Sequence, residues 1–136
     1  MERELAALFE VIVKPRPLPG REDWRDGWTE EVRIGGVEFR VTMVRHETTP
    51  RAPWRRPRVW WGATIHSLPD EGLRFQGRVN ANSTLVHLFR VAGLLLQGQC
   101  GHWTTCWHYD RALGACDACA AEVAEARAEA AEAVPA

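Results

Sequence analysis

Alternating apolar and polar residues predict a β-hairpin near position 35. Val32 and Ile34 alternate with charged residues, and a Gly35-Gly36 pair follows them. Apolar residues then alternate again over 37–43. Two glycines between two such segments favour a tight turn, so the pattern predicts two antiparallel strands that share one apolar face.

Two more strands are expected after this hairpin. Residues 59–67 and 73–79 are rich in apolar residues, and each stretch follows a segment of turn-forming residues. Because the four predicted strands are consecutive and short, they predict a four-stranded antiparallel sheet.

The segment before the sheet is open to two interpretations. Apolar residues recur at helical spacing over 2–13, which predicts a short amphipathic helix, although 9–13 could equally begin a strand. Three prolines and a glycine over 14–20 are expected to end any regular element.

Two helices are expected after the sheet. Residues 80–83 offer a helix cap, and apolar residues fall at helical spacing from Thr84 to Leu96, with Gly98 just past the end, so this helix should cover the apolar face of the sheet. Residues 118–133 are mostly Ala and Glu, with Val123 as the single larger apolar residue. Such a helix has little to bury and should project into solvent.

These elements predict an α+β protein of modest size. The chain has 136 residues, of which 46% are hydrophobic, and this is enough for one folded core. We expect an α+β core domain over 1–98, followed over 99–136 by a metal-binding knuckle and the Ala/Glu helix. The absence of a long apolar stretch and of an export signal predicts a cytoplasmic protein.

All four cysteines of the chain lie within twenty residues, at Cys100, Cys106, Cys116 and Cys119. Thiols stay reduced in the cytosol, so this clustering predicts a metal site rather than disulfides. The C-x₂-C pair allows both sulfurs to face one ion, and one structural Zn²⁺ per chain bound by the four cysteines is the first expectation.

Two histidines leave the ligand set open. His102 or His108 could replace Cys100 or Cys106 in a Cys₃His site. An iron–sulfur cluster, a catalytic site and free thiols remain as further alternatives.

The spacing of these residues resembles one class of zinc-binding fold. A knuckle that supplies one pair of ligands, followed by a helix that carries the second pair, is similar to the arrangement in treble-clef zinc fingers. The resemblance covers about 20–30 residues around the cysteines. It implies a treble-clef-like zinc knuckle in which the second pair, Cys116 and Cys119, lies at the start of the Ala/Glu helix.

The sequence lacks the common catalytic motifs. The H-x-E and P-C-x-x-C pattern of zinc deaminases, the H-E-x-x-H motif and Gly-rich phosphate loops are absent. Four cysteine ligands would also close the coordination shell, whereas a catalytic zinc keeps one position open. We therefore expect that the protein is not an enzyme.

The basic residues gather in the middle of the chain. Residues 33–90 carry ten basic and four acidic residues, whereas both flanking segments are acidic and the net charge is −1. Within this region, the eleven residues 51–61 contain four arginines and three tryptophans. They are Arg51, Trp54, Arg55, Arg56, Arg58, Trp60 and Trp61. Arginines can hold phosphates while tryptophans stack on bases, and the same residue types are enriched in protein interfaces. A third interpretation places Trp60 or Trp61 in the core and leaves the rest as a loop.

These observations favour a binding module without enzymatic activity. The expected protein is a zinc-stabilised adaptor or regulator of bacterial or phage type, whose Arg/Trp-rich face engages nucleic acid or an acidic protein. The alternatives are an inhibitor or assembly factor that binds protein alone through the C-terminal helix, or a small metal-dependent enzyme.

Overall fold

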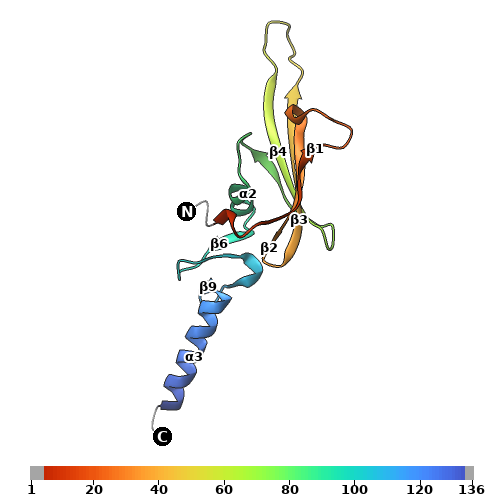
Figure 1. Cartoon of the computed structure of the whole chain (residues 1–136). Helices are drawn as coiled ribbons and strands as arrows, with labels where there is room; N and C mark the ends of the chain where they lie inside the picture. The colour runs from red at the N-terminus through yellow and green to blue at the C-terminus, as the bar shows by residue number, and fades with distance from the viewer. Residues whose placement is uncertain (1–4, 134–136) are drawn as a thin grey trace. The chain divides into compact units, whose positions relative to one another are not determined.

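The computed structural model describes residues 5–133. The chain divides into two compact units, Met1–Ala92 and Gly93–Ala136. The first unit contains a five-stranded antiparallel sheet and a helix, α2 (Leu85–Val91) (Figure 1). The strands follow one another in the sheet in chain order, as β1 (Glu10–Pro17), β2 (Gly27–Ile34), β3 (Val37–Thr48), β4 (Arg58–Ser67) and β5 (Leu73–Val79). A short 3₁₀ turn, η1 (Trp24–Asp26), precedes β2.

The sheet has five strands, not the four that were expected. The four predicted strands correspond to β2–β5, and the additional strand is β1. The expected helix over 2–13 is therefore wrong for 10–13, which are extended, and 2–4 lie outside the described residues.

The strand β1 continues through the first prolines of the 14–20 stretch and ends within that stretch, at Pro17. Pro15 and Pro17 lie within β1, and β1 is an edge strand of the sheet. An edge strand pairs on one side alone, so it tolerates residues without an N–H donor. The pairing with β2 also shifts register twice, between Val11 and Val13 and between Val13 and Arg16.

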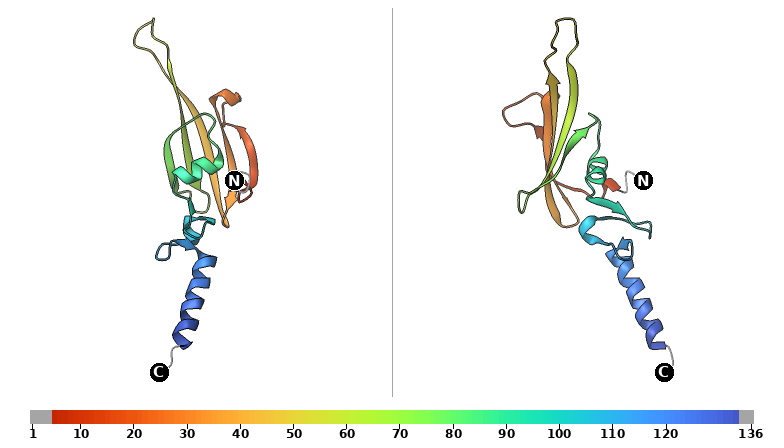
Figure 2. Two further views of the ribbon diagram at one scale, coloured as in Figure 1. Left: turned by 90° about the vertical axis from the view of Figure 1, so that its left-hand side faces the viewer. Right: turned by 180° about the vertical axis from the view of Figure 1, so that it is seen from behind.

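One face of the sheet forms the core of the first unit. Its side chains alternate along the strands with those of the opposite face, as a period of two requires. The buried apolar residues of this face are Val32, Ile34, Phe39, Val41, Met43, Ala63 and Ile65. Helix α2 lies over this face (Figure 2), where the ring of Phe89 packs edge-on against Phe39 and Phe9 at centroid distances of 5.3 and 5.0 Å. We call the opposite side of the sheet the outer face.

Helix α2 begins at Leu85, one residue later than expected, with Thr84 rather than a residue of 80–83 as its cap, and it ends early. The Thr84 side chain accepts a hydrogen bond from the His87 amide at 3.2 Å, which caps the helix. The helix was expected to reach Leu96, but it ends at Val91, and Gly93 adopts a left-handed conformation with φ of 73°. Leu95 belongs to a strand instead.

The second unit consists of two short hairpins and a helix. Its first hairpin joins β6 (Leu95–Gln97) and β7 (Trp103–Thr105), and a 3₁₀ turn, η2 (Cys106–His108), follows. The second hairpin joins β8 (Tyr109–Asp110) and β9 (Ala115–Cys116), which leads into α3 (Asp117–Ala133).

Helix α3 is exposed along most of its length. Every residue of the helix from 121 to 132 is exposed, and Val123 retains 38% of its accessible surface. None of the helices within residues 5–133 has the length and apolar character that a membrane span requires.

Candidate metal centre

The β6–β7 hairpin presents two of the candidate ligands, Cys100 and His102. The chain turns between the two strands, where the Gly98 amide donates to the His102 carbonyl at 3.0 Å and the Gly101 amide donates to the Gly98 carbonyl at 2.9 Å. Gly101, between the two ligands, has a φ of 86°, a conformation that glycine adopts without strain. The tight turn therefore brings a thiol and an imidazole to the same side of the hairpin.

The other two ligands come from the junction between β9 and α3. Cys116 is the last residue of β9, and Cys119 lies in the first turn of α3. The preceding β8–β9 turn is held by the Asp110 carboxylate, which accepts hydrogen bonds from the amides of Ala112 and Leu113 at 3.0 and 3.1 Å. A C-x₂-C spacing across a strand–helix junction allows the two sulfurs to approach one point.

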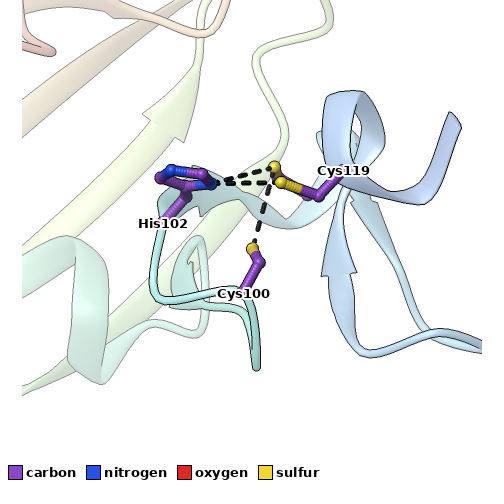
Figure 3. Close-up of side chains that lie close together, drawn as sticks. Cys100, His102 and Cys119 are labelled. Carbon is purple, nitrogen blue, oxygen red and sulfur yellow. Dashed lines mark hydrogen bonds between the residues drawn. The ribbon is translucent and has the colours of Figure 1, made fainter. Parts of the chain in front are cut away.

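The four side chains converge on one point. Their ligand atoms all lie within 4.8 Å of one another. The Cys100 and Cys116 sulfurs are 3.9 Å apart, and the His102 Nδ1 atom lies 3.2 Å from the Cys119 sulfur and 3.8 Å from the Cys116 sulfur (Figure 3). Three sulfurs and one imidazole nitrogen at these distances could bind a metal ion.

The thiols of this cluster have different proton affinities. Hydrogen bonds from the backbone of Cys116 and of His102 lower the pKa of the Cys100 thiol to about 6. The side chain of Cys116, burial and the side chain of Cys100 raise the pKa of Cys119 to about 12. Several thiolates this close together repel one another, and a bound cation balances such charges.

Cys106 is not one of the four clustered residues, although it was expected as a ligand. It begins η2, where its amide donates to the Leu94 carbonyl at 3.0 Å. The clustered set therefore corresponds to the Cys₃His alternative in which His102 takes the place of Cys106. The short Cys-Gly-His motif of the turn is the signal that distinguishes this set from the four cysteines.

His108, the other alternative ligand, is also absent from the cluster. Its Nδ1 atom lies 3.4 Å from a carboxylate oxygen of Asp117. This exposed pair lies beside the start of α3 and orients the imidazole toward a carboxylate.

The arginine- and tryptophan-rich segment forms the end of the β3–β4 hairpin, which we call the arginine hairpin (residues 48–61). Figure 1 shows it as the long loop beyond the rest of the sheet. The arginines are exposed, and Trp54 retains 83% of its accessible surface. None of them makes an ion pair with a carboxylate in the part of the chain that the structure describes. These arginines are Arg51, Arg55, Arg56 and Arg58.

The two adjacent tryptophans of β4 point to opposite faces of the sheet, and both are half-buried. Trp60 lies on the outer face and stacks on His46 at a centroid distance of 4.0 Å, while the Arg78 guanidinium lies 4.4 Å from its ring. His46 and Arg78 were not expected as binding residues, because only the register of β3, β4 and β5 places them beside Trp60.

No family model, curated protein or solved structure matches this chain.

Proposed function

We propose that the Cys/His cluster binds one structural Zn²⁺ ion. Thiolate and imidazole are the ligands that zinc prefers, and bond lengths of about 2.3 Å to sulfur and 2.0 Å to nitrogen place tetrahedral ligand atoms roughly 3.5–3.8 Å apart. The contacts of 3.2, 3.8 and 3.9 Å between the cluster atoms are compatible with this geometry. Four protein ligands fill the coordination shell, which supports a structural rather than a catalytic ion.

The second unit has a physical need for such an ion. Its buried apolar side chains, within the described residues, are Leu94, Leu95, Ala115 and Ala120, and two of these are alanines. A unit that buries so few large side chains gains little from the hydrophobic effect, and small domains of this kind commonly depend on a metal. An ion that joins the knuckle to the start of α3, as in a treble-clef-like arrangement, would supply that stability.

The function that we propose for the whole chain is binding of nucleic acid, without enzymatic activity. The observation that carries this proposal is the arginine hairpin. Its exposed arginines flank Trp54 in the chain, and the sequence contains no carboxylate from position 48 to position 69. Arginines hold phosphates in this setting, while an exposed indole stacks on an unpaired base.

An acidic protein partner is less compatible with the same surface. Protein interfaces bury a central apolar region inside a polar rim. The loop of the arginine hairpin, residues 49–57, presents Trp54 as its single large apolar side chain and surrounds it with cations. A charged loop of this kind suits a polyanion that can wrap around it.

Binding of a fluorescently labelled single-stranded oligonucleotide, followed by anisotropy at several salt concentrations, tests the proposal. Affinity should fall steeply with salt, because phosphate contacts release counterions. The double substitution R55E and R56E should reduce affinity by at least about tenfold at low salt, since it removes two phosphate contacts and adds repulsion. Trp54→Ala should also weaken binding, by about fivefold or more.

Matched variants elsewhere in the same unit serve as controls. The double substitution R21E and R25E makes the same change in charge at two exposed positions, and Trp24→Ala removes another indole, which is 50% exposed. Both controls should retain binding. An oligonucleotide that fails to bind even at low salt would contradict the proposal, and a partner captured through α3 after nuclease treatment would favour the protein-only alternative.

A further inference from the structure

A row of polar residues crosses all five strands on the outer face. In the strand registers, Arg16 of β1 pairs with Thr29, Thr29 pairs with Thr42, and Thr42 pairs with Thr64. Gln76 of β5 completes the row. Residues directly opposite one another point to the same face of a sheet, so these side chains form one continuous polar row. Its centre is tied by a hydrogen bond of 3.2 Å between the Thr29 and Thr42 hydroxyls.

The neighbouring row on the same face leaves a groove. Gly62 of β4 pairs with Val44 on one side and with Arg78 on the other. Because Gly62 has no side chain, the rings of His46 and Trp60 can lie close to its backbone. A Cβ atom at this position would lie 3.3 Å from the His46 Nε2 atom and 3.6 Å from the Trp60 ring.

A stack of planar groups forms one wall of this groove. The imidazole of His46 and the indole of Trp60 are nearly parallel, at an angle of 15° and a centroid distance of 4.0 Å. The guanidinium of Arg78 lies 4.4 Å from the same indole. Nucleobases stack on aromatic rings and on guanidinium planes, so this wall has the chemistry to receive a base.

Two cavities occupy the groove and share Thr42. One, of about 280 Å³, lies over Gly62 against Trp60, and the other, of about 360 Å³, lies beside Arg16. Each is close to the lower end of the roughly 300–1,000 Å³ that small-ligand pockets occupy, which suits one base or one phosphate rather than a larger ligand. No acidic residue lines either cavity.

Arg16 gives a separate indication that the ligand is anionic. Its Nη1 atom is buried and has no hydrogen-bond partner among the described residues. A buried guanidinium nitrogen without an acceptor is costly, and a phosphate oxygen would satisfy it.

We propose that this groove binds single-stranded nucleic acid, with an unpaired base in the cavity over Gly62 and neighbouring phosphates at Arg16 and Arg78. A base inside a duplex cannot enter a cavity, which is why the ligand is single-stranded. The inference rests on the proposed function, and Arg58 connects the two surfaces. It lies two residues before Trp60 in β4 and therefore on the same face, so one strand can run from the arginine hairpin into the groove.

Paired oligonucleotides test the groove on the intact chain. One is a labelled oligothymidine, and the other has the same backbone with abasic sites in place of the bases. Removal of the bases should weaken binding by about five- to a hundredfold, because stacking is lost while every phosphate is kept. Gly62→Val, which fills the cavity, and Trp60→Ala should each weaken binding of oligothymidine and leave binding of the abasic strand nearly unchanged. Thr64→Val removes one hydroxyl of the polar row without a change of shape and should act in the same direction.

The outcomes separate this inference from the proposed function. If R55E and R56E abolish binding while Gly62→Val, Trp60→Ala and Thr64→Val bind oligothymidine like the unaltered chain, the groove is not used and the hairpin proposal stands alone. If neither oligonucleotide binds at low salt, both proposals are wrong. A Gly62→Val protein that fails to fold is distinguished by its circular dichroism spectrum, and Trp60→Ala and Thr64→Val, each compared on oligothymidine and on the abasic strand, then decide.

Discussion

The Nδ1 atom of His102 lies 3.2 Å from the Sγ atom of Cys119, although seventeen positions separate the two residues in the chain. A backbone hydrogen bond from the Gln99 amide to the Gly114 carbonyl, 2.6 Å long, connects the β6–β7 turn to the β8–β9 turn. The cluster therefore lies where the two hairpins meet, and the β6–β7 turn and the β9–α3 junction each supply two of its four donor atoms.

Substitution of His102 should weaken metal binding, whereas substitution of Cys106 should leave it unchanged. His102→Ala removes one of four clustered donors and should reduce zinc affinity by at least about a hundredfold, a quarter or so of a structural zinc's binding free energy. Cys106→Ser leaves the cluster intact and should retain one zinc per chain. Elemental analysis and competition with a chelator measure both. Loss of zinc from Cys106→Ser, with retention in His102→Ala, would instead identify the four-cysteine site.

Removal of zinc should unfold the second unit and spare the sheet. The second unit buries few large apolar residues, whereas the first has a continuous core around Phe89. After treatment with a chelator, amides of β6–β9 should lose protection from hydrogen exchange, and amides of β2–β4 should keep it. Equal loss of protection in both sets would contradict a metal role confined to the second unit.

Gly98 should tolerate no side chain, because the backbone of the second hairpin approaches it closely. A Cβ atom there would lie 3.0 Å from the Cys100 sulfur, 3.1 Å from the Ala115 Cα atom and 3.2 Å from the Gly114 carbonyl oxygen. Gly98→Ala should therefore lower zinc affinity by about tenfold and stability by about 1–3 kcal/mol. Chelator competition and thermal unfolding give the two values.

Gly72→Ala is the matched control for this substitution. A Cβ atom at Gly72 would meet the end of the exposed Asp70 side chain, at 3.2 Å, which can move aside. Zinc affinity should be unchanged. A Gly98→Ala protein with the affinity of this control would show that the two turns can separate without loss of the site.

The sheet was predictable from the sequence wherever its strands have one buried and one outward face. The alternation of Val32 and Ile34 with charged residues directly reports which side chains face the core. The start of β1 was left open between a helix and a strand over 9–13, and the rest of β1 was missed because prolines disrupt paired strands and the sequence does not reveal that this strand lies at an edge. The length of α2 was overestimated because Leu95 and Leu96 continue the helical spacing beyond Gly93, where the backbone turns.

The candidate metal centre was predictable to its region but not to the four residues that cluster there. Clustered cysteines and histidines indicate a site because few other roles collect them. The choice between Cys106 and His102 depends on the turn at Gly101, a local backbone conformation that spacing does not determine. The outer-face groove could not be found in this way, because it depends on the register of several strands.

Glu30 should make the stability of the protein depend on pH. It lies on the core-facing side of β2, opposite Val41, and is 5% exposed. Burial raises the pKa of Glu30 above its ordinary value of 4.5, because the charged form loses its hydration. Below pH 4.5 the carboxyl is neutral in both states. As the pH rises, the unfolded state ionises first, so this group lowers stability increasingly until the pH passes the raised pKa.

Glu30→Gln should therefore stabilise the protein at neutral pH and have little effect at acidic pH. Glutamine has nearly the same shape and stays neutral, so the gain should be near zero well below pH 4.5 and should grow as the pH rises through the raised pKa. Urea denaturation of both proteins across this range measures it. Glu31→Gln is the control, because Glu31 lies on the outer face, 3.4 Å from the Arg40 guanidinium, and its loss should give no gain. A gain for Glu30→Gln that is independent of pH would show that hydration of the charged form is not its source.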